Sequence, residues 1–327
     1  MPIKLTPSPT ARALAVSVMV LVCGTWLSLN QNDYWLRVTT TALNFALVAL
    51  AWDLLLGYAG QINFAPAAIW GAGGYAAAIL VHRCGVDPWL GLPAAAGVGA
   101  LLGAVLTLPA VRLQRIYLGL FTLAFGELLR LAAINESELT QGPQGIGLSN
   151  IRFTGPLATP SQQQILSLFL LIGTYLILRW LVRSRFGLRL QAMRDDQLAA
   201  EARGIDTRYH KLLAFTISSA IMGLAGGLFA YQLRYISPDM LHIEYSFQFV
   251  VMALFGGVGS LIGPVLGAIS ITFLLEVLRG WEHLRLILLG VVVVANILFF
   301  PHGIANAAIR FLHDRRTDVA LRVRFGS

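Results

Sequence analysis

Apolar runs long enough to cross a lipid bilayer recur along almost the whole chain. A hydrocarbon core about 30 Å thick needs roughly twenty apolar residues in helical conformation, and backbone polar groups in lipid must be satisfied within the protein. The pattern therefore predicts an all-α, polytopic helical membrane protein with about ten transmembrane or re-entrant helices. The expected spans are residues 14–30, 38–56, 66–81, 89–111, 116–134, 163–181, 209–232, 244–256, 261–279 and 284–300.

Composition leads to the same class. Hydrophobic residues make up 57% of the 327 positions and charged residues 12%, which excludes an ordinary soluble protein. The spans leave no room for a separate soluble domain, so we expect a single transmembrane domain over residues 1–327. The net charge of +8 does not indicate nucleic-acid binding, because the basic residues lie in loops between spans, where anionic lipid and the positive-inside rule explain them.

The basic residues also predict an orientation in the membrane. The first apolar run follows Lys4 and Arg12 and lacks a small-residue cleavage site, so we interpret it as a signal anchor with a cytoplasmic N-terminus. Ten spans return the C-terminus to the same side. The arginine-rich segment at about 182–208 then becomes a cytoplasmic loop, and the Gly- and Pro-rich segment at about 135–162 becomes an extracytoplasmic loop suited to docking an external partner.

A charged, alanine-rich stretch within the 182–208 loop predicts a short helix between two spans. Asp195 or Asp196 can cap a helix over residues 198–202, and Gly204 can close it in the left-handed conformation. Small side chains let a partner's backbone approach closely, and charged groups at the edge can orient it through ion pairs. An ordinary loop helix fits the spacing equally well. The residues expected to couple to a partner are Arg194, Asp195, Asp196, Ala199, Ala200, Glu201, Ala202 and Gly204.

Two segments rich in glycine and proline, GYAGQINFAP at 57–66 and GGVGSLIGP at 256–264, interrupt the apolar pattern. They predict broken helices or re-entrant segments, which survive at membrane depth only when buried in protein or lining a cavity. Their occurrence once in each half suggests an internal repeat. Tight helix packing through small residues is the alternative. The glycines concerned are Gly57, Gly60, Gly257, Gly259 and Gly263.

Ionisable residues also occur inside apolar spans, where they are costly in lipid. Glu127 and Arg130, like Glu276 and Arg279, lie three positions apart and can neutralise each other as structural ion pairs. Asp53 has no such partner and is expected to face the protein interior or a substrate pathway. The residues expected to line a pathway are Asp53, Gln61, Asn63, Glu127 and Arg130.

The sequence offers no catalytic or cofactor constellation. Its only lysines, Lys4 and Lys211, do not follow a glycine, so a phosphate-binding Gly-Lys-Ser/Thr loop is absent and any ATP must bind another chain. The six histidines are scattered, and the two cysteines, Cys23 and Cys84, provide neither zinc spacing nor a disulfide framework. We therefore expect that this chain is not an enzyme and has neither metal nor cofactor of its own.

Several ordered motifs, taken together, point to one family. They are GYAGQINFAPAAIWGAGGYAAAIL at 57–80, YLGLFTLAFGELLRL at 117–131, TQGPQGIGLSNI at 140–151, the segment 187–230, YISPDM at 235–240, ALFGGVGSLIGPVLGA at 253–268 and FFPHGI at 299–304. Over nearly its whole length, the chain resembles the membrane permeases of ABC importers for branched-chain amino acids, specifically the M-type of the two related Liv-type permeases.

This resemblance implies an assembly in a bacterial inner membrane. It would contain a second permease of the H-type, two cytoplasmic ATPases that bind ATP and Mg²⁺, and an extracytoplasmic substrate-binding protein. Transport would proceed by alternating access. By the same resemblance, the segment around Ala199, Ala200, Glu201 and Gly204 is the loop that docks on the ATPase.

Departures from the family pattern leave the substrate open. Asp53 stands where the family commonly has Asn, and GQINFAPA stands where it often has GQLSLGHA. Branched-chain amino acids are the first expectation, and urea or short amides are the alternative. A proton- or sodium-coupled secondary transporter, with Asp53 and Glu127 as coupling carboxylates, and a polytopic membrane enzyme are rival classes.

Overall fold

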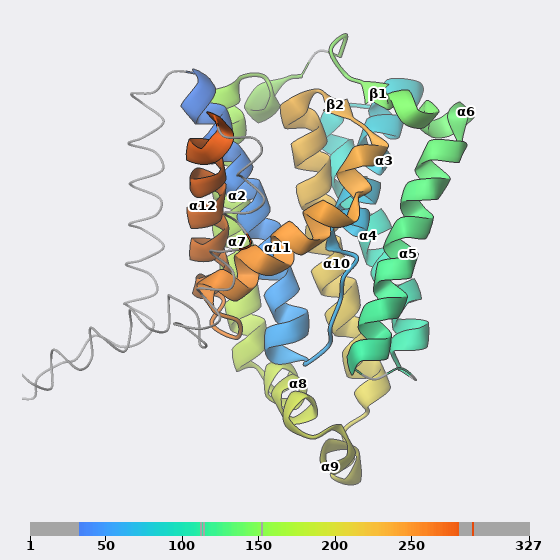
Figure 1. Cartoon of the computed structure of the whole chain (residues 1–327), viewed down its shortest axis with the longest axis vertical. Coiled ribbons are helices and arrows are strands. Elements are labelled where there is room, and N and C mark those ends of the chain that lie inside the picture. The colour runs from blue at the N-terminus through green and yellow to red at the C-terminus, as the bar shows by residue number, and fades with distance from the viewer. Residues whose placement is uncertain (1–32, 112, 114, 152, 281–289, 291–327) are drawn as a thin grey trace, which may run out of the picture.

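The structure is a computed structural model that describes residues 33–111, 113, 115–151, 153–280 and 290. These residues form a bundle of helices that stand side by side, with one long helix, α10, packed against three others (Figure 1). The long helices are α2 (Asp33–Asp53), α3 (Pro66–Cys84), α4 (Pro88–Ala110), α5 (Arg115–Asn135), α7 (Pro160–Arg183) and α10 (Thr207–Leu233).

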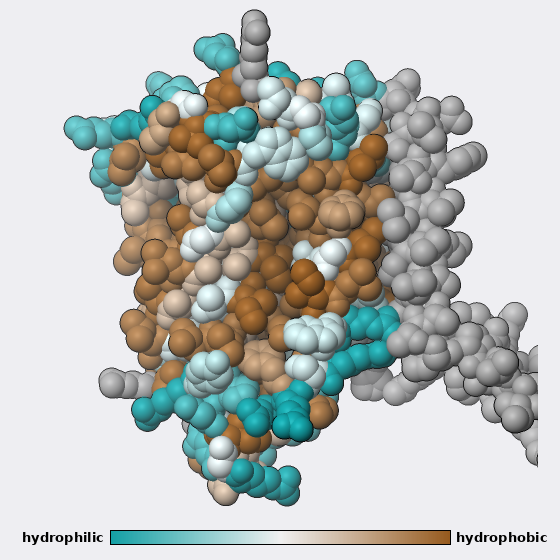
Figure 2. Space-filling model, turned by 180° about the vertical axis from the view of Figure 1, so that it is seen from behind, coloured by the Kyte–Doolittle hydropathy of each residue, from teal (hydrophilic) through white to brown (hydrophobic). Residues whose placement is uncertain are grey.

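Five helices in the described part of the chain are long and apolar enough to cross a membrane. They are α2 with its π-helical extension η1 (Leu54–Tyr58), α4, α5, α7 and α10. Figure 2 shows a broad apolar band around the middle of one face, with hydrophilic side chains at both ends. The predicted class of polytopic helical membrane protein is therefore confirmed. The expected span 14–30 lies outside the described residues, as does 284–300 apart from Gly290.

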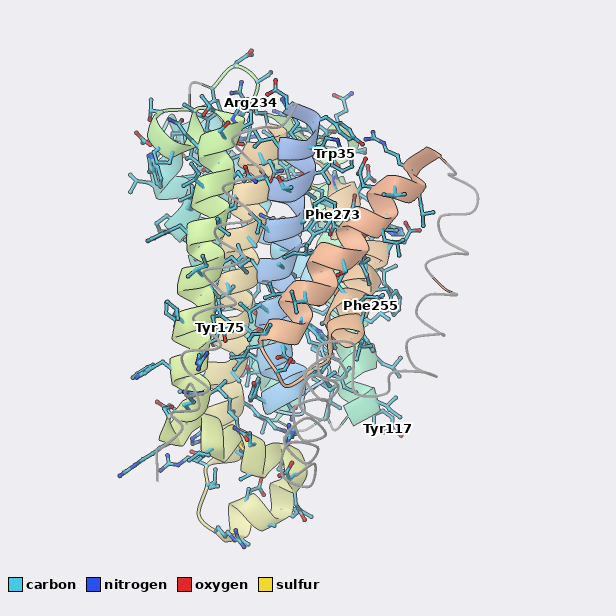
Figure 3. All side chains as sticks on the ribbon, turned by 90° about the vertical axis from the view of Figure 1, so that its left-hand side faces the viewer. Trp35, Tyr117, Tyr175, Arg234, Phe255 and Phe273 are labelled. Atoms are coloured by element: carbon cyan, nitrogen blue, oxygen red, sulfur yellow. The ribbon has the colours of Figure 1, made fainter. Side chains whose placement is uncertain are left out.

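Two shorter helices complete the bundle. α11 (Ile243–Gly256) crosses the front of the bundle obliquely in Figure 1, and α12 (Ile262–Val277) runs back along α2. Trp35 of α2 and Phe273 of α12 stack with their ring centroids 6.3 Å apart (Figure 3). A short 3₁₀ turn, η5 (Leu278–Gly280), follows α12.

Glycine allows α10 to approach its neighbours backbone to backbone. A Cβ atom added at Gly226 of α10 would lie 1.7 Å from the carbonyl oxygen of Trp70 in α3. One added at Gly99 of α4 would lie 2.2 Å from the carbonyl oxygen of Ser219 in α10. Small residues of this kind are the usual means of close helix contact in membranes. Glycine packing thus sets how close α3 and α4 come to α10.

A buried polar group is satisfied where α2, α3 and α10 meet. The Asn44 amide nitrogen donates to the Ala225 carbonyl oxygen at 2.8 Å, and its amide oxygen accepts from the Trp70 indole N–H at 3.2 Å. The Trp70 ring packs against Phe45 and Phe229, with centroids 6.0 and 4.6 Å away. Because both ends of the amide have partners, Asn44 fixes the register of the three helices without an unpaired group.

The two long loops emerge at opposite ends of the bundle (Figure 1). The 182–208 segment contains α8 (Arg185–Asp195) and α9 (Gln197–Ala202). At the other end β1 (Ile146–Gly147) pairs antiparallel with β2 (Tyr235–Ile236), with Ile146 opposite Ile236. The remaining short elements of that end are α6 (Ser137–Thr140), η2 (Gly142–Gln144), η3 (Gly155–Leu157) and η4 (Pro238–Leu241).

Candidate coupling and pathway site

The short helix expected in the 182–208 segment is present as α9. The Asp196 carboxylate accepts from the Ala199 backbone N–H at 3.1 Å, so Asp196 rather than Asp195 caps the helix. Gly204 follows the end of α9 with φ of +80°, in the left-handed region. Ala200 is buried, whereas Ala199, Glu201 and Ala202 are exposed.

α8, the helix that precedes α9, was not predicted from the sequence. α7 ends where Ser184 adopts an extended conformation, and the Ser184 hydroxyl accepts from the Phe186 backbone N–H at 3.2 Å. Serine is a strong N-cap residue, and this cap was the signal in the sequence that could have located the start of α8. Asp195 is the last residue of α8, so only the cap residue Asp196 separates α8 from α9.

Glu201 has its hydrogen bonds within the chain. Its carboxylate accepts from the Thr207 hydroxyl at 2.6 Å and from the Gln197 side-chain amide at 2.9 Å. These bonds favour the ionised form, so they hold the pKa of Glu201 below its usual range, with Thr207 the larger cause. Glu201 therefore links α9 to the first turn of α10.

Arg194 extends from α8 back toward the bundle. One terminal nitrogen of its guanidinium donates to the Gly57 carbonyl oxygen at 2.7 Å. The Nε atom and the other terminal nitrogen donate to the Asp195 carboxylate at 3.2 and 3.1 Å. Arg194 thus joins the 182–208 segment to the first of the two expected broken segments.

The two broken segments meet each other. In the first, η1 ends at Tyr58 and residues 60–65 are not helical before α3 begins at Pro66. In the second, residues 257–261 separate α11 from α12. The Tyr58 hydroxyl donates to the Gly259 carbonyl oxygen at 2.9 Å, and a Cβ added at Gly57 would lie 2.7 Å from the Gly259 nitrogen. Both expected helix interruptions are present, and the two interrupted segments pack tightly against each other.

Asp53 binds the second broken segment. Its fully buried carboxylate accepts from the backbone N–H groups of Gly259 at 2.6 Å and Leu261 at 3.1 Å. Leu261 has φ of +57°, a conformation rarely adopted by residues other than glycine. Asp53 therefore faces the protein interior and holds the turn that leads into α12. Nothing in the sequence around Leu261 signalled this conformation.

Gly257 and Gly263 occupy the two ends of the same turn. Gly257 has φ of +103°, and Gly263 donates its backbone N–H to the Ser260 hydroxyl at 2.9 Å. A Cβ added at Gly263 would lie 2.3 Å from the Gly257 carbonyl oxygen. The turn therefore needs glycine at one end for its backbone conformation and at the other for space.

Gln61 and Asn63 lie in the non-helical stretch before α3. The Asn63 carbonyl oxygen accepts from the Trp52 indole N–H at 2.7 Å, and its side-chain oxygen accepts from the Ala65 backbone N–H at 2.8 Å. The Asn63 amide nitrogen is buried without a hydrogen-bond partner. Gln61 donates to the Ala59 carbonyl oxygen at 3.2 Å. Both side chains thus support the local backbone, and Asn63 retains a free donor.

Glu127 and Arg130 form an ion pair on α5, with 2.5 Å between the nearest nitrogen and oxygen. Their side chains are 40% and 21% exposed within a helix long enough to span the membrane. Gly126 lies against Ala65 just before α3, because a Cβ there would be 3.7 Å from the Ala65 Cα. Gly126 thus places this turn of α5 beside the start of α3, and the ion pair that follows it is partly exposed.

The second predicted ion pair, Glu276 and Arg279, lies at the opposite end of α2 from Asp53. Arg279 and Glu276 are 3.2 Å apart, and the Tyr34 hydroxyl, near the start of α2, donates to the Glu276 carboxylate. α12 therefore runs antiparallel to α2, with Asp53 and Leu261 together at one end and Tyr34 and Glu276 at the other. Among the described residues, no group of three or more His, Cys, Asp or Glu side chains could hold a metal ion.

Comparison with known proteins places the chain in a family. The family described as "Branched-chain amino acid transport system / permease component" matches residues 34–297. The LivM permease of the high-affinity branched-chain amino acid transport system of Escherichia coli K12 is 29% identical over 292 residues, covering 82% of this chain and 69% of that protein. The LivH permease of the corresponding system of Salmonella typhimurium LT2 is 25% identical over 252 residues, covering 70% and 80%. No solved structure matches the chain. The match over most of its length shows that the chain belongs to the branched-chain amino acid transport permeases and is a Liv-type permease of the M-type.

Proposed function

We propose that this ABC importer permease pairs with an H-type relative to form a pathway for branched-chain amino acids through the bacterial inner membrane. Two ATPases, which bind ATP and Mg²⁺, would dock at the α8–α9 end, and a substrate-binding protein would dock at the end that carries α6 and the β1–β2 pair. The α8–α9 end and both termini would then be cytoplasmic, in agreement with the arginines of the 182–208 segment.

The observation that carries this proposal is the exposed surface of α9. Leu198 is 75% exposed at an end of the bundle where hydrophilic side chains predominate. Ala199 and Ala202 beside it are small, so a partner's backbone can approach closely. An exposed leucine with small neighbours on a capped helix provides an apolar anchor for a partner protein.

The pathway is proposed to run along the face where the broken segments and α5 meet. A partly exposed ion pair on a spanning helix is costly in lipid. We therefore expect the second permease or water to cover the face of α5 that carries Glu127 and Arg130. Gln61 and Asn63 are buried in the stretch before α3, in which the neighbouring Ile62 and Phe64 lie against Gly119 of α5. Asp53 borders the pathway from inside the protein, where it holds the second broken segment.

The substrate class rests on the relatives. The permeases named above belong to branched-chain amino acid systems, which favours that class over urea or short amides. Asp53 is an acidic residue near the pathway, but its carboxylate is engaged by two backbone N–H groups. Both carboxylate oxygens of Asp53 are therefore engaged within the protein rather than directed at a substrate.

The test is purification of the permease pair with its candidate ATPases, followed by uptake of labelled leucine and urea into proteoliposomes with and without ATP. We expect ATP-dependent leucine uptake, and we expect Leu198→Ser to abolish co-purification of the ATPase. Leu139→Ser is the matched control, because Leu139 is an exposed leucine at the opposite end of the bundle. Uptake by the isolated chain on an ion gradient would instead establish a secondary transporter.

A further inference from the structure

We propose that Arg194 is the positioning residue that transmits movement of α9 to both broken segments. This inference rests on the proposed function, in which an ATPase docks on α9. Its basis is geometric: Arg194 lies two residues before the cap of α9, yet its side chain reaches the bundle. Movement of α9 would therefore act directly on the backbone of the first broken segment.

Arg194 contacts the first broken segment at two points. Its guanidinium donates to the Gly57 carbonyl oxygen at 2.7 Å, at the π-helical turn that ends the α2 span. Gly60, with φ of +66°, lies against the stem of the side chain, because a Cβ there would be 2.9 Å from the Arg194 Cγ and 3.1 Å from its Cα. The segment therefore cannot shift relative to α8 without breaking the hydrogen bond or this packing.

The same carbonyl lies beside the second broken segment. A Cβ added at Gly259 would be 3.6 Å from the Gly57 oxygen and 4.0 Å from the nearest Arg194 nitrogen. Asp53 and Tyr58, on either side of Gly57, both hydrogen-bond the backbone of Gly259. Displacement of the Gly57 turn is therefore passed to the turn before α12 through three direct contacts.

The other edge of the guanidinium binds the last residue of α8. Its Nε and second terminal nitrogen donate to Asp195, the residue directly before the α9 cap. Arginine suits this position because its planar group donates in two directions at once, whereas lysine is a single flexible point charge. The geometry thus requires the shape of arginine as well as its charge.

The experiment uses the whole reconstituted complex and measures leucine uptake and ATP hydrolysis together. We expect Arg194→Gln to retain ATPase co-purification and hydrolysis within about twofold, while uptake per ATP falls by about tenfold or more, within the range of ordinary coupling free energies. Arg194→Lys should retain more leucine uptake per ATP hydrolysed than Arg194→Gln, but less than the wild type. Arg189→Gln, at an exposed arginine on the same helix, should behave as the wild type.

A distance measurement separates transmission from docking. Spin labels at Ala202 on α9 and at Val258 in the second broken segment are each paired with a label at Leu139, after replacement of Cys23 and Cys84. In the wild type, ATP should shift both distances. In Arg194→Gln, only the Ala202 distance should shift.

Each other outcome has a defined meaning. Wild-type uptake per ATP in Arg194→Gln, or an unchanged shift at Val258, would overturn the inference. Loss of ATPase co-purification in Arg194→Gln would make Arg194 a docking residue and would also overturn it. If the wild-type permease pair itself binds no ATPase, the proposed function fails first, which is a distinguishable result.

Discussion

Asp53 at the end of α2 accepts a hydrogen bond of 2.6 Å from the backbone N–H of Gly259, 206 positions further along the chain. This bond joins the two interrupted regions of the protein, and the neighbouring bond to Leu261 makes the carboxylate a double acceptor. A buried carboxylate used in this way stabilises a turn whose N–H groups would otherwise lack partners in an apolar setting. Its removal therefore affects backbone groups far away in the sequence.

We predict that Asp53→Ala lowers the free energy of unfolding by about 2–6 kcal/mol, because two buried N–H groups lose their acceptor at roughly 1–3 kcal/mol each. Asp53→Asn should cost less, since it keeps one acceptor oxygen. Unfolding in mixed detergent micelles, followed by tryptophan fluorescence, provides the measurement. Asp195→Ala, at an exposed carboxylate, is the control. Equal stability of Asp53→Ala and the wild type would refute the double-acceptor role.

Gly57→Ala should be destabilising for steric reasons. The added Cβ would lie 2.3 Å from the Asp53 carboxylate and 2.7 Å from the Gly259 nitrogen, so the two broken segments must separate. We expect a loss of about 1–3 kcal/mol, typical of overpacking, in the same unfolding assay. Gly173→Ala in α7 is the matched control, because nothing lies within 4 Å of its added Cβ. A smaller loss for Gly57→Ala than for Gly173→Ala would contradict this account.

Gly226→Ala should loosen α10 from α3. The new Cβ would lie 1.7 Å from the Trp70 carbonyl oxygen, a backbone atom that cannot rotate away. Gly97→Ala in α4 meets open space and should be neutral or stabilising by about 0.5–1 kcal/mol, because alanine favours the helix. Thermal inactivation of uptake by the two variants gives the comparison. The idea fails if they inactivate at the same temperature.

Protonation of Glu201 should weaken the link between α9 and α10. Because hydrogen bonds from Thr207 and Gln197 lower the pKa of Glu201 in the folded protein, its stabilising contribution is complete above the unfolded pKa of about 4.3 and is lost as the pH falls through the folded value. A spin label at Ala202 should therefore become more mobile as the pH is lowered from about 6 to 3. Thr207→Val should reduce this pH dependence. A pH-independent label in the wild type would argue against the link.

The helical class and most span positions could be predicted from the sequence, because the apolar stretches that form α4, α5, α7 and α10 are long. The cap of α9 was predictable for a local reason, namely an Asp three residues before the N–H that it accepts from. Both features depend on neighbouring residues only.

The long-range contacts could not be predicted in the same way. Asp53 and Arg194 each hydrogen-bond the backbone of a distant glycine, which carries no side-chain signal. These glycines, Gly259 and Gly57, lie 206 and 137 positions away. The conformation of Leu261 is likewise set by its surroundings rather than by its residue type. The sequence identified both glycine-rich segments correctly as interruptions, yet only their packing shows that they contact each other.

The glycine contacts of α10 also bear on how the chain is made. Gly73 of α3 and Gly99 of α4 both lie against the backbone of α10, which is synthesised more than a hundred residues later than either. During translation, α3 and α4 therefore enter the bilayer with bare glycine surfaces that have no permanent neighbour. Assembly of the bundle has to wait for residues 207–233, and a nascent chain that stalls before them lacks its central helix and exposes these surfaces to the insertion machinery.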